Sequence, residues 1–274
     1  MNCLADNKNL LYRYRSTKDM GIERIFTHNE LYFSSPLQFN DPFDCQIHIH
    51  FKEEDETFFK NKAIDIYKKN FCDLTEEQID KKLDEDIKKQ GYKKYSDFFK
   101  KEINFNDYVY RHNLCFGICT FSAVCNDILM YSHYSDGHKG FCLVFNKENE
   151  FFKDVKKIIY PRDDSYPDIS SSDAMNGDTK LDNIFIYKSN RWDYEKEFRI
   201  IKNTGSGIYN FPEESLLGVI FGCKMKDEDK LTIMQWAKKR ETPLHLFQAG
   251  KQEKEYRLDI NPLDMKISNL GVSV

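Results

Sequence analysis

The sequence predicts an α+β fold in which a mainly antiparallel sheet is interrupted by a helical insertion. Strand-like runs of aromatic and β-branched residues fill about residues 1–51 and 113–274, whereas segments with a helical apolar period gather at about 53–112. Because the helical segments are grouped and do not alternate with the strands, the class is α+β and not alternating α/β. We expect one domain, residues 1–274, with the insertion at about 53–112.

The N-terminal stretch contains two predicted strands and a long loop. Residues 10–15 alternate along a strand, which places Arg13 and Arg15 on the same face as Leu11. A short helical segment follows, and residues 31–34 form the second strand. Residues 35–44 contain two prolines and an Asn-Asp pair, which are typical of an ordered loop with fixed turns.

The insertion has the composition of solvated helices. It is rich in Lys, Glu and Asp, and Thr75 with Gln78 forms a capping-box pattern at the start of a helix. Gly91 is a suitable end for that helix. We expect its charges to form a solvated face.

The C-terminal stretch returns to strands. Residues 161–177 are polar and predict a loop, and the last ten or so residues are expected to fray. Strands are predicted at 115–120, 140–145, 155–160, 217–222, 244–248 and 256–260, and a helix at 226–240.

The most informative segment, residues 192–201, also predicts a strand. Its alternation places Glu195, Glu197 and Arg199 on one face and apolar residues on the other. Two adjacent carboxylates are suited to binding a cationic group or a sugar hydroxyl. The alternative is a surface ladder in which Arg199 neutralises its neighbours.

Two further pairs of polar residues lie between predicted strands. Thr120 and Ser122 follow one strand, where hydroxyls either cap a helix or bind a ligand. His133 and Tyr134 would provide a polar, aromatic wall of a pocket. The alternative for His133 is a hydrogen-bonded structural role.

Composition excludes several classes of protein. The formal net charge of −4 gives no argument for nucleic-acid binding, and no run of roughly 18 apolar residues predicts a membrane span. The N-terminus lacks the pattern of a signal peptide, so we expect a cytoplasmic protein with reduced thiols and no membrane partner. Motifs of serine hydrolases, P-loop enzymes, Rossmann dehydrogenases and zincins are absent from the sequence.

Two groups of Cys and His residues were considered as metal ligands. Neither contains a Cys-x-x-Cys pair or histidines at i and i+4, so no metal site is expected. The two groups are Cys45, His48 and His50, and Cys115, Cys119 and Cys125.

Four motifs stand out in the sequence. They are LYRYRS at 11–16, FNDPFD at 39–44, LMYSHY at 129–134 with GHKGF at 137–141, and WDYEKEFR at 192–199. Together they resemble the signatures of a bacterial family of unknown function that is often found near mobile elements and phage-defence genes. The resemblance extends over about residues 10–225, without the insertion. It implies a defence or toxin–antitoxin setting, with an antitoxin or defence protein as partner.

A second resemblance concerns the order of an arginine, hydroxyl residues and a Glu-x-Glu pair, which is similar to that of Arg–Ser–Glu ADP-ribosyltransferases. It implies the split, twisted sheet of that family and NAD as the substrate. Carried over, Arg13 or Arg15 binds the phosphates, whereas Thr120 and Ser122 support the nicotinamide pocket. Residues 119–122 read Cys-Thr-Phe-Ser and thus depart from the family's Ser-Thr-Ser segment.

The same resemblance implies the catalytic roles. Glu197 would hold the ribose and stabilise the oxocarbenium ion, whereas Glu195 would orient the acceptor. A carboxylate near a developing positive charge stabilises the transition state more than the ground state. No metal is needed for this chemistry.

Four hypotheses of function follow. The first is an enzyme that cleaves NAD and transfers ADP-ribose to a macromolecule, either protein or nucleic acid, as a toxin or phage-defence effector. The second is an NAD glycohydrolase, and the third is a non-enzymatic sensor of a nucleotide or phage protein. The fourth is a magnesium-dependent nuclease that uses Asp41, Asp44, Glu195 and Glu197.

Overall fold

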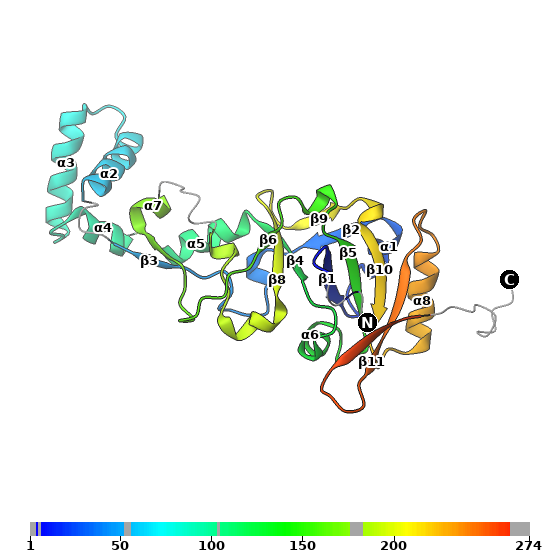
Figure 1. The fold of residues 1–274 in the computed structure, drawn as a ribbon. Coiled ribbons are helices and arrows are strands. Elements are labelled where there is room, and N and C mark those ends of the chain that lie inside the picture. The colour runs from blue at the N-terminus through cyan, green and yellow to red at the C-terminus, as the bar shows by residue number, and fades with distance from the viewer. Residues whose placement is uncertain (1–3, 5–6, 52–55, 103–104, 176–182, 264–274) are drawn as a thin grey trace.

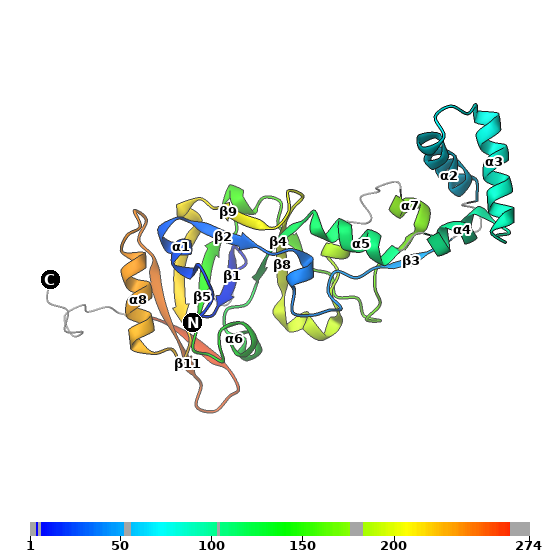
Figure 2. The same cartoon turned by 180° about the vertical axis from the view of Figure 1, so that it is seen from behind.

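The computed structural model describes residue 4 and residues 7–51, 56–102, 105–175 and 183–263. The molecule is elongated, with a sheet-containing body at one end and a small group of helices at the other (Figures 1 and 2). The expected fraying of the last ten residues concerns a segment outside the described residues. In the described part of the chain, no helix is both long and apolar enough to cross a membrane.

The body is built around an eight-stranded sheet within the described residues. Neighbouring strands are antiparallel except for the parallel pair β10 and β11, which confirms the α+β class with a mainly antiparallel sheet. In spatial order the strands are β12 (Leu258–Pro262), β11 (His245–Lys251), β10 (Leu216–Phe221), β5 (Phe141–Asn146), β1 (Leu10–Arg15), β4 (Gly117–Ser122), β8 (Glu197–Lys202) and β6 (Lys156–Lys157).

Both faces of this sheet are covered by apolar cores. Helices α1 (Ile22–Thr27) and α8 (Asp227–Ala237) pack on one face, where Leu11 of β1 is fully buried. Helix α6 (Ile128–Tyr134) packs on the other face against Tyr12, the next residue of β1. Alternate residues of one strand therefore enter different cores, as the period of two requires.

Two small sheets extend the body. Strands β2 (Glu30–Phe33) and β9 (Gly207–Asn210) are antiparallel, whereas β3 (His48–His50) and β7 (Asp168–Ser170) are parallel. Short 3-10 helices connect several elements. They are η1 (Pro36–Gln38), η3 (Glu150–Phe152), η5 (Asn190–Glu195) and η6 (Glu213–Ser215).

The polar loop predicted at 161–177 is partly wrong. Strand β7 is followed directly by helix α7 (Ser171–Met175). Ile169 and Ala174 are buried in a small core with Ile184 and Phe185. These apolar residues are too few to dominate the local composition, but their burial outweighs the turn propensity of the neighbouring Asp and Ser residues.

The helices predicted in about 53–112 are present. The capping box of Thr75 and Gln78 starts α3, as expected. Phe59, Leu83 and Phe99 are fully buried in a core that the helices form among themselves. This core is formed by α2 (Glu56–Asn70), α3 (Glu76–Lys89) and α4 (Tyr95–Glu102), and α5 (Phe105–Leu114) follows them in the chain.

Candidate functional site

A cavity of about 560 Å³ lies beside three adjacent strands, β1, β4 and β8. Its volume is within the ~300–1,000 Å³ that is common for small-molecule sites. All eight residues that the sequence analysis assigned to NAD binding, to catalysis on NAD or to the pocket wall line it. These residues are Arg13, Arg15, Thr120, Ser122, His133, Tyr134, Glu195 and Glu197.

The two arginines of β1 both reach this cavity but have different contacts. Arg13 is mostly buried, and its Nη1 donates to the backbone oxygen of Thr120 at 2.5 Å. Arg15 is less buried, and its Nε lies 3.0 Å from Oδ2 of Asp19. Burial and the nearby Arg13 charge lower the pKa of Arg15 to about 10, so the Arg15 guanidinium group remains charged at neutral pH.

The strand predicted at 192–201 is correct only for its second half. Residues 190–195 form the 3-10 helix η5, in which the Ser189 side chain accepts a hydrogen bond from the backbone N–H of Arg191. Lys196 then adopts a left-handed conformation with φ of 45° and turns the chain into β8. Glu195 and Glu197 are therefore not alternate residues of one strand. The turn that starts at Ser189 continues through the aromatic residues, although such residues are typical of a strand.

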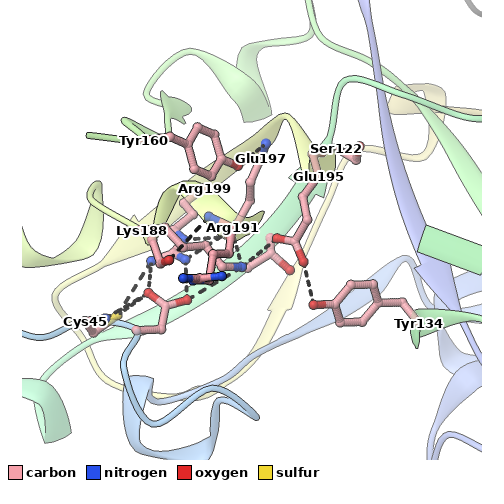
Figure 3. A network of polar contacts seen from close by, with 12 residues as sticks. Cys45, Ser122, Tyr134, Tyr160, Lys188, Arg191, Glu195, Glu197 and Arg199 are labelled. Carbon is pink, nitrogen blue, oxygen red and sulfur yellow. Dashed lines mark hydrogen bonds and ion pairs between the residues drawn. The ribbon is translucent and has the colours of Figure 1, made fainter. Parts of the chain in front are cut away.

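The two glutamates nevertheless meet, because both bind the same lysine. Nζ of Lys188 donates to Oε2 of Glu195 at 2.5 Å and to Oε2 of Glu197 at 2.9 Å (Figure 3). Glu195 and Glu197 are only 3% and 4% exposed. The alternative of a solvent-exposed ladder is therefore wrong.

Arg199 lies on the other side of this network and donates hydrogen bonds to two of its carboxylates. Its Nη1 and Nη2 donate to the two carboxylate oxygens of Asp44 at 3.0 and 2.7 Å, and its Nε donates to Oε1 of Glu197 at 2.6 Å. The guanidinium group also donates to the backbone oxygen of Phe185, and its whole side chain is buried. We call Asp44, Lys188, Glu195, Glu197 and Arg199 the buried charge cluster.

The cluster gives its two glutamates opposite pKa shifts. Burial alone raises the pKa of Glu197, but Arg199 and Lys188 outweigh it and lower the value to about 2. Burial also raises the pKa of Glu195, and the Glu197 charge adds to this effect against the attraction of Lys188. Glu197 is thus a fixed anion, whereas Glu195 is the more easily protonated group.

Tyr134 connects Glu195 to the cavity wall. Its hydroxyl donates to Oε1 of Glu195 at 2.6 Å, and burial together with the Glu195 charge raises the pKa of Tyr134 (Figure 3). The neighbouring His133 is exposed, and its ring centroid lies 6.3 Å from that of Trp192 and 6.4 Å from that of Tyr194. The expected aromatic wall is present and continues into η5.

The hydroxyl residues of β4 position other groups of the site. Oγ of Ser122 donates to the backbone oxygen of Glu195 at 2.6 Å and so holds the end of η5 against β4. Thr120 accepts the hydrogen bond from Arg13 through its backbone oxygen. Neither residue caps α6, since Asp127 accepts from the backbone N–H groups of Leu129 and Met130.

The acidic residues of the nuclease hypothesis converge only in part. Asp44, Glu195 and Glu197 approach one another, but they do so around Lys188 and Arg199, whose positive charges occupy the place that a metal ion would need. This arrangement does not favour magnesium binding.

Neither group of Cys and His residues comes together as a whole among the described residues. Cys45 is buried against Arg199, whereas His48 is exposed and His50 is half-buried on β3. Cys119 and Cys125 belong to different apolar cores.

The sequence did not identify Lys188 or Tyr160 as residues of the site. Lys188 lies outside the motif at 192–199 and resembles any surface lysine in sequence. The hydroxyl of Tyr160 accepts the backbone N–H of Glu197 at 3.0 Å. The excess of three carboxylates, from Asp44, Glu195 and Glu197, over the single Arg199 was the one signal that a second cation was required.

Comparison with known proteins gives one match. Residues 130–200 match the model of a protein family described as a protein of unknown function (DUF2971). The matched segment runs from α6 to β8 and includes Tyr134, Lys188 and both glutamates, so similarity to a family of unknown function is confirmed for this part of the chain. No curated protein and no solved structure matches.

Proposed function

We propose that the cavity binds NAD, cleaves its bond to nicotinamide and transfers ADP-ribose to a macromolecular acceptor. The observation that carries this proposal is the meeting of two arginines and two carboxylates in one cavity beside β1, β4 and β8. These are the groups that the resemblance to Arg–Ser–Glu ADP-ribosyltransferases assigns to substrate binding and catalysis. A toxin or phage-defence effector is the setting that we infer for it.

The arginine side of the cavity is suited to a pyrophosphate. Guanidinium groups bind phosphate oxygens through paired, charge-assisted hydrogen bonds. Arg15 is more exposed than Arg13 and is held by a single carboxylate, Asp19. We assign the main phosphate contact to Arg15 and a supporting contact to Arg13, whose Nη1 is already used by Thr120.

The carboxylate side is suited to the positive charge that develops on the ribose. The buried charge cluster contains three carboxylates and two cations, which leaves one negative charge when all five are ionised. Glu197 remains anionic at neutral pH and provides a preorganised charge near the oxocarbenium ion. A fixed charge in a water-excluded site requires no reorganisation during the reaction.

Glu195 is suited to a different step. Its raised pKa and its hydrogen bond to Tyr134 fit a general base that accepts the proton of the incoming acceptor. With water as acceptor the same groups would produce free ADP-ribose, which is the glycohydrolase alternative. Both transfer and hydrolysis therefore need Glu197. They differ in the acceptor from which Glu195 takes the proton, which is a macromolecule in transfer and water in hydrolysis.

The decisive experiment measures nicotinamide release from NAD by the purified protein without added metal. Glu197→Gln should reduce release about a hundredfold or more, because it removes a charge that stabilises the transition state. Glu195→Gln should impair transfer to an acceptor more than hydrolysis. Glu253→Gln, a change at an exposed glutamate, is the matched control and should retain full activity.

The outcomes separate the hypotheses. Labelled ADP-ribose on a macromolecule supports the transferase, and free ADP-ribose alone supports the glycohydrolase. NAD binding without release by folded protein would support a sensor. Full activity of Glu197→Gln with a normal melting temperature would falsify the mechanism.

A further inference from the structure

A second group of ionisable side chains lies on the surface, on the parallel pair of strands β3 and β7. Nδ1 of His48 lies 2.8 Å from Oδ1 of Asp168, and Nδ1 of His50 lies 2.9 Å from the same oxygen. One donor atom from each residue lies within 4.8 Å of the others. Two imidazoles and a carboxylate thus converge on one point.

The backbone holds these three residues together. His48 pairs with Asp168 in the parallel register, and His50 is the alternate residue on the same face of β3. On the opposite face, Ile169 is buried in an apolar core and Ile49 packs against it. The donors are therefore presented by a pair of strands that is anchored from behind.

We propose that His48, His50 and Asp168 bind a divalent transition-metal ion, with Zn²⁺ as the ion of choice. Imidazole nitrogens and carboxylate oxygens are ordinary zinc ligands, at distances of about 2.0–2.2 Å. The ion would replace the hydrogen bonds that now join each Nδ1 to Oδ1, and water would complete its coordination. Small movements of exposed side chains are sufficient to open the required separation between the donors.

The location indicates a structural role for the ion. β3 precedes the helices α2–α4 in the chain, and β7 leads directly into α7. In both views, β3 lies between the body and the distant helices (Figures 1 and 2). A bound ion would tie β3 to β7 at this place, so that metal binding stiffens the connection between the two ends of the molecule. This proposal does not depend on NAD cleavage.

The test is calorimetric titration of the full-length protein, free of any histidine tag, with ZnCl₂. Exposed thiols also bind zinc, so the titration uses a background in which Cys72→Ser and Cys115→Ser remove the two exposed cysteines of the described chain. We expect one equivalent of Zn²⁺ to bind and the melting temperature to rise.

Ligand variants decide whether the ion binds at this place. His48→Ala and Asp168→Ala should each weaken Zn²⁺ binding by about tenfold to a hundredfold or more. His245→Ala, at an exposed histidine of another strand, is the matched control and should bind like the parent. Far-UV circular dichroism verifies that each variant is folded.

Hydrogen exchange provides a second readout. Zn²⁺ should slow the exchange of backbone amides in β3 and β7 in the parent and in His245→Ala, but not in His48→Ala. Absence of stoichiometric binding in the parent, or equal binding by all variants, would overturn the proposal and leave a hydrogen-bonded histidine pair.

Discussion

The buried charge cluster and the His48–His50–Asp168 group show two ways of bringing ionisable side chains together. In the first, Arg199 is fully buried and Glu197 is 4% exposed. In the second, the side chains of His48 and Asp168 are 68% and 56% exposed. Both groups join residues that are distant in sequence, but only the second is broadly exposed to water.

This difference decides what each charge contributes. In the buried cluster, water cannot replace a lost partner, so each cation is required by the carboxylates around it. At the surface, water and salt screen the charges, and the loss of one partner has little effect on folding. The buried cluster is therefore coupled to the stability of the protein, whereas the surface group is available to bind an ion from solution.

The largest effect is expected for Arg199→Met. This change leaves Asp44 and Glu197 buried without their main partner, and we expect the free energy of unfolding to fall by about 3–5 kcal/mol. Urea-induced unfolding measures it. Arg257→Met is the control at a half-exposed arginine and should shift stability by about 1 kcal/mol or less. Equal losses of stability in the two variants would contradict the claim that burial decides how much a charged side chain contributes to folding.

The second effect concerns ligand binding by β1. Arg15→Ala should weaken NAD binding by about tenfold to a hundredfold, since hydrogen bonds to charged groups contribute roughly 1.5–3 kcal/mol. Arg13→Ala should have a smaller effect on affinity, because one of its donors is bound to Thr120. Titration calorimetry with NAD measures both. Normal NAD binding by both folded variants would show that the arginines of β1 do not bind the phosphates.

The third prediction uses the pH dependence of stability. The folded-state pKa of Glu197 is lowered from 4.5 to about 2, so its contribution is present above pH 4.5 and lost as pH falls towards 2. The pKa of Glu195 is raised, and its contribution has the opposite sign, because it is lost as pH rises through the folded value.

Glu197→Gln removes the first contribution and weakens the second, because the Glu197 charge helps to raise the pKa of Glu195. We therefore expect the stability of the wild type to fall between pH 4.5 and 2, with a slope from Glu197 of at most about 1.4 kcal/mol per pH unit. The variant should have a flatter profile and lower stability at pH 7. Thermal unfolding across this pH range measures both curves, and Glu253→Gln should follow the wild type. Parallel curves for Glu197→Gln and wild type would contradict the assigned shift.

The smallest effect is expected at the surface group in the absence of metal. His48→Ala removes an exposed contact with Asp168 and should change the free energy of unfolding by about 1 kcal/mol or less. Urea-induced unfolding in the presence of a chelator measures this. A loss as large as that of Arg199→Met would mean that this group, too, is part of the folded core.

Local patterns were sufficient to predict much of the fold. The period of two in β1 placed Arg13 and Arg15 towards the same cavity, and the capping box at Thr75 predicted the start of α3. They were insufficient at η5, where a serine cap and a left-handed Lys196 outweighed aromatic residues that are typical of strands. Competing local signals of similar strength are decided by packing.

The sequence by itself determined the α+β class, the grouping of helices and the shared face of Arg13 and Arg15, because these depend on periodicity and on near neighbours. Only the tertiary structure brought Lys188 between the two glutamates and joined Asp44 to Arg199, 155 residues away. It also placed Asp168 against His48, 120 residues earlier in the chain. Such pairs depend on how the whole chain packs, and no local pattern records them.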